Sequence, residues 1–211
     1  MPSKRTLSIT AAEWPDRANE VIERILIGGV ALFPTETVYG LGALPNENGV
    51  QKMISLKMRP KGKPFQLLIS DLGALDKCDA VVSPLAEKVM EKFWPGPLTI
   101  VLDVTEGLFP FGLAPQQNVG FRMPAHELCR DLVRRCGGTL AASSANVAGQ
   151  PEPRTCQDAL RQFAIGRLDA AIDGGPTGDS LPSTVISVRN GDITVIRKGA
   201  VAESALLELQ G

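Results

Sequence analysis

Segments typical of strands and segments typical of helices alternate along the chain of 211 residues, and this alternation limits the possible folds most strongly. Short apolar runs predict strands at 30–33, 65–69, 98–103, 118–123, 139–144, 169–173, 183–188 and 193–197. Apolar residues at helical spacing predict helices at about 16–27, 48–58, 84–93, 125–136, 156–163 and 202–209. Such interleaving is typical of an α/β fold. We expect a single domain over 1–211, with its core at about 14–200, built on a strongly twisted mixed parallel and antiparallel sheet with flanking helices.

Two helix starts are marked by capping residues. Ser83 precedes Pro84, which combines a capping side chain with a proline at the first helical position. Thr155 and Asp158 have the spacing of a capping box. The sequence therefore predicts helices that begin directly after Ser83 and Thr155.

Composition excludes several classes of protein. Hydrophobic residues make up 44% of the chain, which is enough for a sizeable core. The 22 basic and 23 acidic residues nearly balance, which argues against a wholly basic nucleic-acid binder. Four scattered cysteines and a single histidine do not form a zinc motif and indicate a reduced, cytoplasmic protein. The apolar runs are too short to cross a bilayer, so we expect no membrane association.

Residues 33–42, FPTETVYGLG, follow a predicted buried strand. Polar residues between a strand end and two glycines fit a ligand pocket at a sheet edge, where backbone approaches a small molecule. The alternative is a turn whose threonines bond their own backbone. Both interpretations stay open from the residues alone.

Residues 57–64, KMRPKGKP, place four cations at alternate positions, Lys57, Arg59, Lys61 and Lys63. In an extended segment alternate side chains share a face, so these cations are suited to a polyphosphate. The simpler alternative is a solvated cationic surface.

Three later segments carry further candidates. Arg122 ends a strand and has the fork that binds a carboxylate, although a surface ion pair is the simpler reading. Residues 143–146, SSAN, form a small polar loop suited to a phosphate or an adenylate, or simply a polar loop. Ser183 and Arg197 lie at the ends of two late strands. His126 is better explained as a residue that begins a helix than as a general base.

In this order, the segments PTETVYGLG, KMRP, WPGPLT, RMPAH, SSAN, and STV followed by IRKG resemble the threonylcarbamoyl-AMP synthase family, also called YrdC-like, in its short single-domain form. The resemblance runs from about residue 29 to 199. It implies a nucleotidyltransferase that makes threonylcarbamoyl-AMP and pyrophosphate from L-threonine, bicarbonate and ATP with Mg²⁺. It also implies a partner complex that transfers the threonylcarbamoyl group to adenosine 37 of tRNA, with tRNA itself as a further candidate partner.

The resemblance also implies roles for individual residues. Those expected to contact threonine are Thr37, Arg122, Ala142 and Ser183. Those expected to bind ATP are Lys57, Arg59, Lys63, Asn118, Ser144, Asn146 and Arg197, with Lys57 and Arg59 also catalytic.

Three positions depart from the family pattern. Many members have a histidine where this chain has Leu68, a serine in place of Glu152 and a glutamate in place of Pro182. These departures keep open a paralogue that binds or hydrolyses carbamoyl-adenylates without making them. An RNA-binding module that uses the cations of 57–63 is a second alternative.

Overall fold

The computed structural model describes residues 5–59, 63–105, 109, 113, 117–163 and 167–210. Its strands are β1 Leu7–Thr10, β2 Ala31–Phe33, β3 Gly40–Ala43, β4 Gln66–Ile69, β5 Leu98–Asp103, β6 Asn118–Arg122, β7 Thr139–Ser144, β8 Ala170–Asp173, β9 Thr184–Arg189 and β10 Asp192–Arg197. Its helices are α1 Trp14–Leu26, α2 Glu47–Lys57, α3 Gly73–Lys77, α4 Pro84–Phe93, α5 Glu127–Arg135, α6 Cys156–Gln162 and α7 Glu203–Leu207, with a 3-10 turn at Ala11–Glu13. None of the helices found in these ranges is long and apolar enough to cross a membrane.

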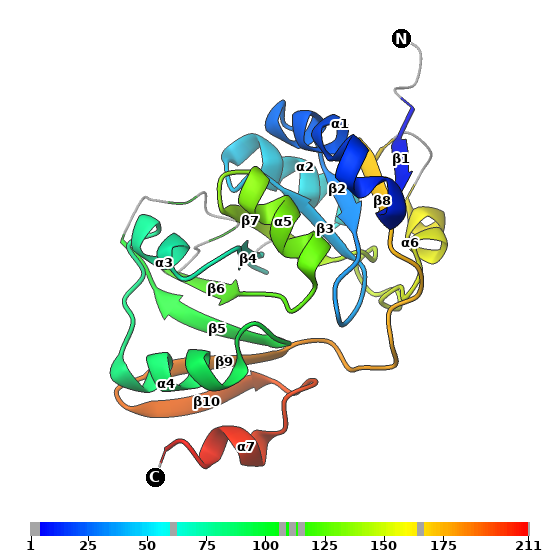
Figure 1. The fold of residues 1–211 in the computed structure, drawn as a ribbon. Helices are drawn as coiled ribbons and strands as arrows, with labels where there is room; N and C mark the ends of the chain where they lie inside the picture. Colours follow the sequence, from blue (N-terminus) through cyan, green and yellow to red (C-terminus); the bar gives the residue numbers. More distant parts are fainter. Residues whose placement is uncertain are drawn as a thin grey trace.

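The ten strands form one mixed sheet in the order β1-β8-β2-β3-β7-β4-β6-β5-β9-β10. The pairs β1–β8, β2–β8, β4–β6 and β5–β9 are parallel. The other five pairs are antiparallel, including the late hairpin of β9 and β10. The predicted mixed sheet is therefore confirmed. Figure 1 shows the strand direction turning strongly between β1 and β10, with helices on both sides of the sheet.

Strand alternation decides which side chains enter the core and which line the site. On β5, Ile100 and Leu102 are buried in the larger apolar cluster with Val89 and Met90 of α4. Thr99 and Val101 point to the other face, where a cavity lies. A second apolar cluster packs α1 and α5 against further strands and includes Leu68.

Both predicted helix starts are confirmed. The Ser83 side chain accepts a hydrogen bond from the Ala86 N–H at 3.2 Å, and Thr155 accepts one from Asp158 at 3.1 Å. His126 likewise begins α5, where its Nδ1 accepts a hydrogen bond from the Cys129 N–H at 3.4 Å. The helix-starting interpretation of His126 is correct.

The glycines of the 33–42 segment do not leave space for a ligand, so that part of the expectation is wrong. Gly40 and Gly42 lie in β3, which is an interior strand between β2 and β7. A Cβ at Gly40 or Gly42 would lie 2.9 Å or 2.7 Å from the ring of Phe33. The missing side chains make room for this fully buried ring rather than for a small molecule.

Replacement of Gly42 tests this packing. We expect Gly42→Ala to lower the free energy of unfolding by about 1–3 kcal/mol, because the enclosed Phe33 ring must move. Urea denaturation measures the change. Gly178→Ala is the control, because a Cβ there meets no atom within 4 Å, and it should be nearly neutral. Equal stability of the two variants would contradict the packing argument.

Candidate functional site

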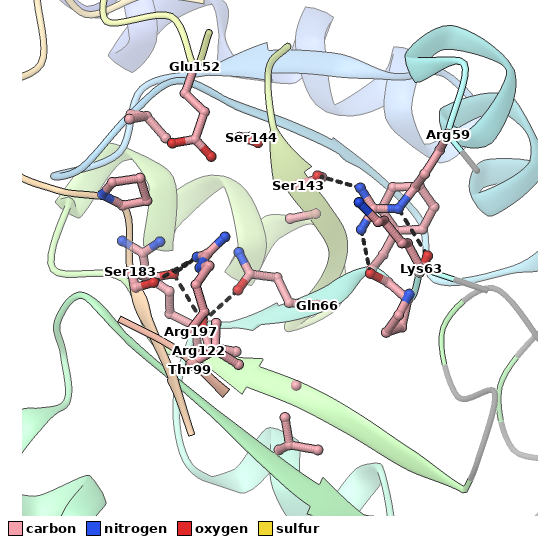
Figure 2. Close-up of a pocket in the computed structure, with 18 of the residues that line it drawn as sticks. Arg59, Lys63, Gln66, Thr99, Arg122, Ser143, Ser144, Glu152, Ser183 and Arg197 are labelled. Carbon is pink, nitrogen blue, oxygen red and sulfur yellow. Dashed lines mark hydrogen bonds between the residues drawn. The ribbon is translucent and has the colours of Figure 1, made fainter. Parts of the chain in front are cut away.

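A cavity of about 350 Å³ opens on the face of the sheet opposite the larger apolar cluster. Its residues come from β4, β5, β6, β7, the start of β9, the end of β10 and four loops (Figure 2). They are Val38, Arg59, Lys63, Pro64, Phe65, Gln66, Thr99, Val101, Asn118, Gly120, Arg122, Ala142, Ser143, Ser144, Glu152, Pro182, Ser183, Val185 and Arg197. The volume lies within the usual range for small-molecule sites.

A chain of polar side chains crosses the floor of the cavity. Thr99 Oγ1 donates to Gln66 Oε1 at 2.7 Å and lies 3.2 Å from Ser183 Oγ. Arg197 Nη2 then donates to the Ser183 carbonyl at 2.7 Å and to its hydroxyl at 3.1 Å. Gly120 keeps the floor open, since a Cβ there would lie 3.0 Å from Thr99 Cγ2. Ser183 and Arg197, which are 14 residues apart, therefore act in one network.

Arg122 is the most enclosed cation of the cavity, with a side chain only 4% exposed. Its Nη2 donates to Glu36 Oε1 at 2.8 Å and to Thr37 Oγ1 at 3.2 Å, and its Nε donates to the Gly96 carbonyl at 3.3 Å. Nη1 has no hydrogen-bond partner among the described residues. Protein groups hold Nη2 and Nε of the planar guanidinium, and Nη1 remains to bind the carboxylate of a ligand.

Glu36 stays ionised beside Arg122. Burial alone would raise its pKa, but the charge and hydrogen bond of Arg122 together with backbone N–H groups outweigh burial and hold the pKa below its usual value. The fork of Arg122 is thereby fixed in one orientation.

Thr37 contacts the site through Arg122, since it is not among the cavity-lining residues. It belongs to a turn in which the Thr35 hydroxyl donates to the Val38 carbonyl at 2.6 Å and accepts from the Thr37 N–H at 3.2 Å. This confirms the alternative in which a threonine bonds its own backbone, and Val38 is the residue of the turn that lines the cavity. A direct contact from Thr37 to threonine stays a prediction.

Two groups of cations face each other across the cavity. Arg59 and Lys63 lie on one side and Arg197 on the other (Figure 2). Arg59 is held by the carbonyls of Lys63 at 3.0 Å and Pro64 at 2.7 Å, by Ser143 Oγ at 3.4 Å and by the Phe65 ring at 4.6 Å. Burial lowers the pKa of Arg59 and Arg197, but both guanidinium groups stay positively charged. Lys61 lies outside the described residues.

The β10 strand is irregular where it presents Arg197. The register of β10 against β9 shifts between Val195 and Arg197, so that Arg197 lies opposite Val185, itself a cavity residue. Such a bulge redirects a side chain at the end of a strand. It brings Arg197 to the cavity and leaves Ile196 58% exposed.

Lys57 is 2% exposed and lies behind the cavity rather than in its lining. Its Nζ donates to the carbonyls of Ser144 and Asn146 and to Asn146 Oδ1, the last two at 2.6 and 3.2 Å. These three acceptors use the three hydrogens of the ammonium group. In this geometry Lys57 fixes the 144–146 loop, and its predicted contact with ATP stays a prediction.

The SSAN loop is closed by its own side chains. Ser144 Oγ donates to Asn146 Oδ1 at 2.7 Å, and Asn146 Nδ2 donates to the Gln150 carbonyl at 2.7 Å. Ser144 and Ala142 of β7 line the cavity, as does Asn118 of β6, whereas Asn146 supports the loop from behind. The structure thus brings eight of the predicted site residues into one cavity and leaves Thr37, Lys57 and Asn146 in its supporting layer.

Sequence reasoning missed Gln66 and Thr99 as site residues. Both are polar residues at alternating positions of otherwise apolar strands, which is a signal for a strand face that does not enter the core. Leu68, two residues after Gln66, is 1% exposed and lies among apolar side chains of α1 and α5. No group of three or more metal-ligating side chains occurs in the part of the chain that the structure describes.

Known proteins are similar to this chain over most of its length. The profile of the Sua5/YciO/YrdC family, described as telomere recombination, matches residues 23–199. Threonylcarbamoyl-AMP synthases of Bacillus subtilis (strain 168) and Pyrococcus abyssi (strain GE5 / Orsay) are 36% and 35% identical over 179 and 175 residues. These alignments cover 84% and 82% of this chain, and the chain spans about half the length of these relatives, 51% in each case.

Solved structures show the same fold. The structure of P. abyssi Sua5 complexed with L-threonine has a TM-score of 0.87 at 32% identity, over 97% of this chain and 60% of that one. Escherichia coli YciO has a TM-score of 0.80 at 23% identity, over 94% of this chain and 97% of that one, which supports the fold alone.

The pH dependence of stability tests the buried position of Lys57. Burial, followed by the positive charge of Arg59, lowers its pKa from 10.5 to about 8, against the opposing effect of Glu152. Between these two values the unfolded chain binds more protons at this group, so the stability contributed by Lys57 rises with pH. We expect the free energy of unfolding of wild type minus that of Lys57→Met to rise by about 1–2 kcal/mol from about pH 8 to 9.5.

The matched control for this comparison is Lys88→Met, which alters an exposed lysine of α4. The free energy of unfolding of wild type minus that of Lys88→Met should not change over the same pH range. If the difference for Lys57→Met also does not change with pH, the ammonium group of Lys57 is not buried as described.

Proposed function

Because this chain belongs to the Sua5/YciO/YrdC family, we propose that it makes L-threonylcarbamoyl-AMP and pyrophosphate from L-threonine, bicarbonate and ATP. One observation carries the proposal: the buried, oriented Arg122 shares a single cavity with Arg59, Lys63 and Arg197. A fork for one carboxylate beside three further cations suits an amino acid and a polyphosphate held together.

The amino acid binds at the Arg122 end of the cavity. Its carboxylate takes Nη1 of Arg122, which no described residue occupies. Ser183 and Thr99 lie in one hydrogen-bonded network in the same cavity, and we expect them to pair with the hydroxyl of threonine. A relative solved with L-threonine supports this choice of substrate.

The chemistry is a carboxylation followed by adenylation. The amine of threonine adds bicarbonate and loses water to give a carbamate. A carbamate oxygen then attacks the α-phosphorus of ATP, and the bond to the β-phosphate oxygen breaks to release pyrophosphate. Negative charge gathers on phosphate oxygens, so Arg59, Lys63 and Arg197 stabilise it as fixed cations. Close placement of carbamate and α-phosphate supplies much of the remaining rate gain.

Magnesium enters as part of the ATP complex rather than as a resident ion. The described residues contain no cluster able to hold a metal by themselves. Mg²⁺ commonly binds through substrate phosphates and one or two carboxylates, which fits a cavity with one acidic side chain, Glu152, among its described lining residues.

The product is a labile mixed anhydride and is used by a separate transferase complex that modifies adenosine 37 of tRNA. The name of the relatives, threonylcarbamoyl-AMP synthase, supports the identity of this product. We place the reaction in the cytoplasm, and the four cysteines, all free and buried, fit a reducing compartment.

Pyrophosphate release tests the proposal. Purified protein with ATP, Mg²⁺ and bicarbonate should release pyrophosphate only when L-threonine is present, and removal of bicarbonate should abolish the release. Release without threonine would contradict the proposed acceptor. No release despite binding of both substrates would favour the paralogue that binds or hydrolyses carbamoyl-adenylates. The buried Leu68, where many family members have a histidine, is the reason for considering this alternative.

Arg59→Ala tests the role of the cations. We expect about a 100-fold loss of threonine-dependent pyrophosphate release, because a fixed charge at the phosphates is removed. Arg161→Ala is the control, since Arg161 is 65% exposed on α6 and should leave the rate unchanged. Thermal unfolding of both variants checks the fold, and normal turnover of a folded Arg59→Ala protein would refute the role.

A further inference from the structure

Glu152 is the one acidic side chain among the described residues that line the cavity. It comes from the loop that follows SSAN, and Figure 2 shows its carboxylate directed into the space bordered by Ser144, Ser183 and Arg197. It forms no ion pair and no hydrogen bond with any described residue, although the cavity holds four cations. Among the described residues, this partly exposed carboxylate has no fixed partner, so it is open to a ligand from outside the chain.

A bare polyphosphate is a poor partner for this carboxylate, because the two repel each other. A divalent cation between them reverses the sign of the interaction. Glu152 lies close enough to Lys57 and Arg197 for its charge to oppose the lowering of their pKa values by burial, which favours the nucleotide side of the cavity. Figure 2 shows the Glu152 carboxylate on the Arg197 side of the cavity, across from Arg59, so a phosphate group bound at Arg197 would lie near Glu152.

We propose that Glu152 is the protein ligand of the magnesium ion that enters with ATP. This inference rests on the proposed function for its nucleotide. Mg²⁺ prefers six oxygen ligands and keeps several waters, so one carboxylate together with two phosphate oxygens completes a common arrangement. Glu152 then selects the magnesium complex of ATP over the free nucleotide, because it attracts the first and repels the second.

The arrangement also predicts the order of binding. A single carboxylate without neighbouring ligands holds Mg²⁺ weakly, and no metal-binding cluster occurs within the described ranges. The metal is therefore retained only when the nucleotide is present.

Equilibrium binding of α,β-methylene-ATP, which cannot be cleaved at the reacting bond, tests the inference by calorimetry with and without Mg²⁺. We expect Mg²⁺ to tighten binding to wild type. In Glu152→Gln, which keeps the shape of the side chain, this gain should fall by about tenfold. Without metal, Glu152→Gln should bind the nucleotide more tightly than wild type, because repulsion is removed. A reversal of the order of the two proteins on adding Mg²⁺ is the expected signature.

The controls separate this role from general effects. Glu91→Gln removes an exposed carboxylate from α4, outside the cavity, and should behave as wild type. Glu152→Ser should repeat the behaviour of Glu152→Gln. With Mn²⁺ in place of Mg²⁺, electron paramagnetic resonance should show nucleotide-dependent retention of the metal by wild type and weaker retention by both Glu152 variants.

Two outcomes would overturn the inference alone: Glu152→Gln binds the nucleotide more tightly both with and without Mg²⁺, or it matches wild type in both conditions. Metal-dependent binding without threonine-dependent pyrophosphate release would overturn the proposed function and leave the Glu152 assignment standing. Absence of nucleotide binding to wild type would overturn both.

Discussion

The buried ion pair between Arg122 and Glu36 joins the parts of the molecule that form the site. Arg122 ends β6 in the middle of the sheet, Glu36 belongs to the loop between β2 and β3, and the Gly96 carbonyl comes from the turn after α4. One guanidinium therefore connects three segments that are distant in sequence. Breaking a buried pair of this kind costs about 3–5 kcal/mol, since the remaining charge loses its partner. The same pair orients the fork that faces the cavity.

Much of the fold follows from local patterns in the sequence. The strands at 98–103 and 139–144 have the bounds predicted for them, because continuous apolar runs of strand length end there in polar residues. β1, β3 and α3 were not predicted. The residues of β3, Gly-Leu-Gly-Ala, have weak strand propensity, and the strand exists because its glycines accept the Phe33 ring between two neighbouring strands. That constraint is tertiary and leaves no local signal.

The sequence predicted which residues belong to the site better than it predicted which of them line the cavity. Chemistry and resemblance identified Arg59, Arg122, Ser183 and Arg197, which the structure places around one cavity. They did not separate these residues from Lys57, whose charge is equally suited to phosphate. Burial decides the difference: the helix α2 ends with Lys57 pointing beneath the 144–146 loop, where carbonyl oxygens take its three hydrogens. Spacing along a chain does not report which side of a loop an ammonium group occupies.

Charge balance explains why the two ends of the cavity differ. Arg122 is already paired with Glu36, so its own charge is balanced, which suits a zwitterion such as an amino acid. Across the cavity, Arg59 and Lys63 have no acidic partner within ion-pair distance among the described residues. In the proposed reaction, carboxylation removes the positive charge of the amine and adds a negative one. The negatively charged carbamate is then attracted to the cations that hold the triphosphate. The carboxylation step therefore favours the close approach of carbamate and α-phosphate that the adenylation step needs.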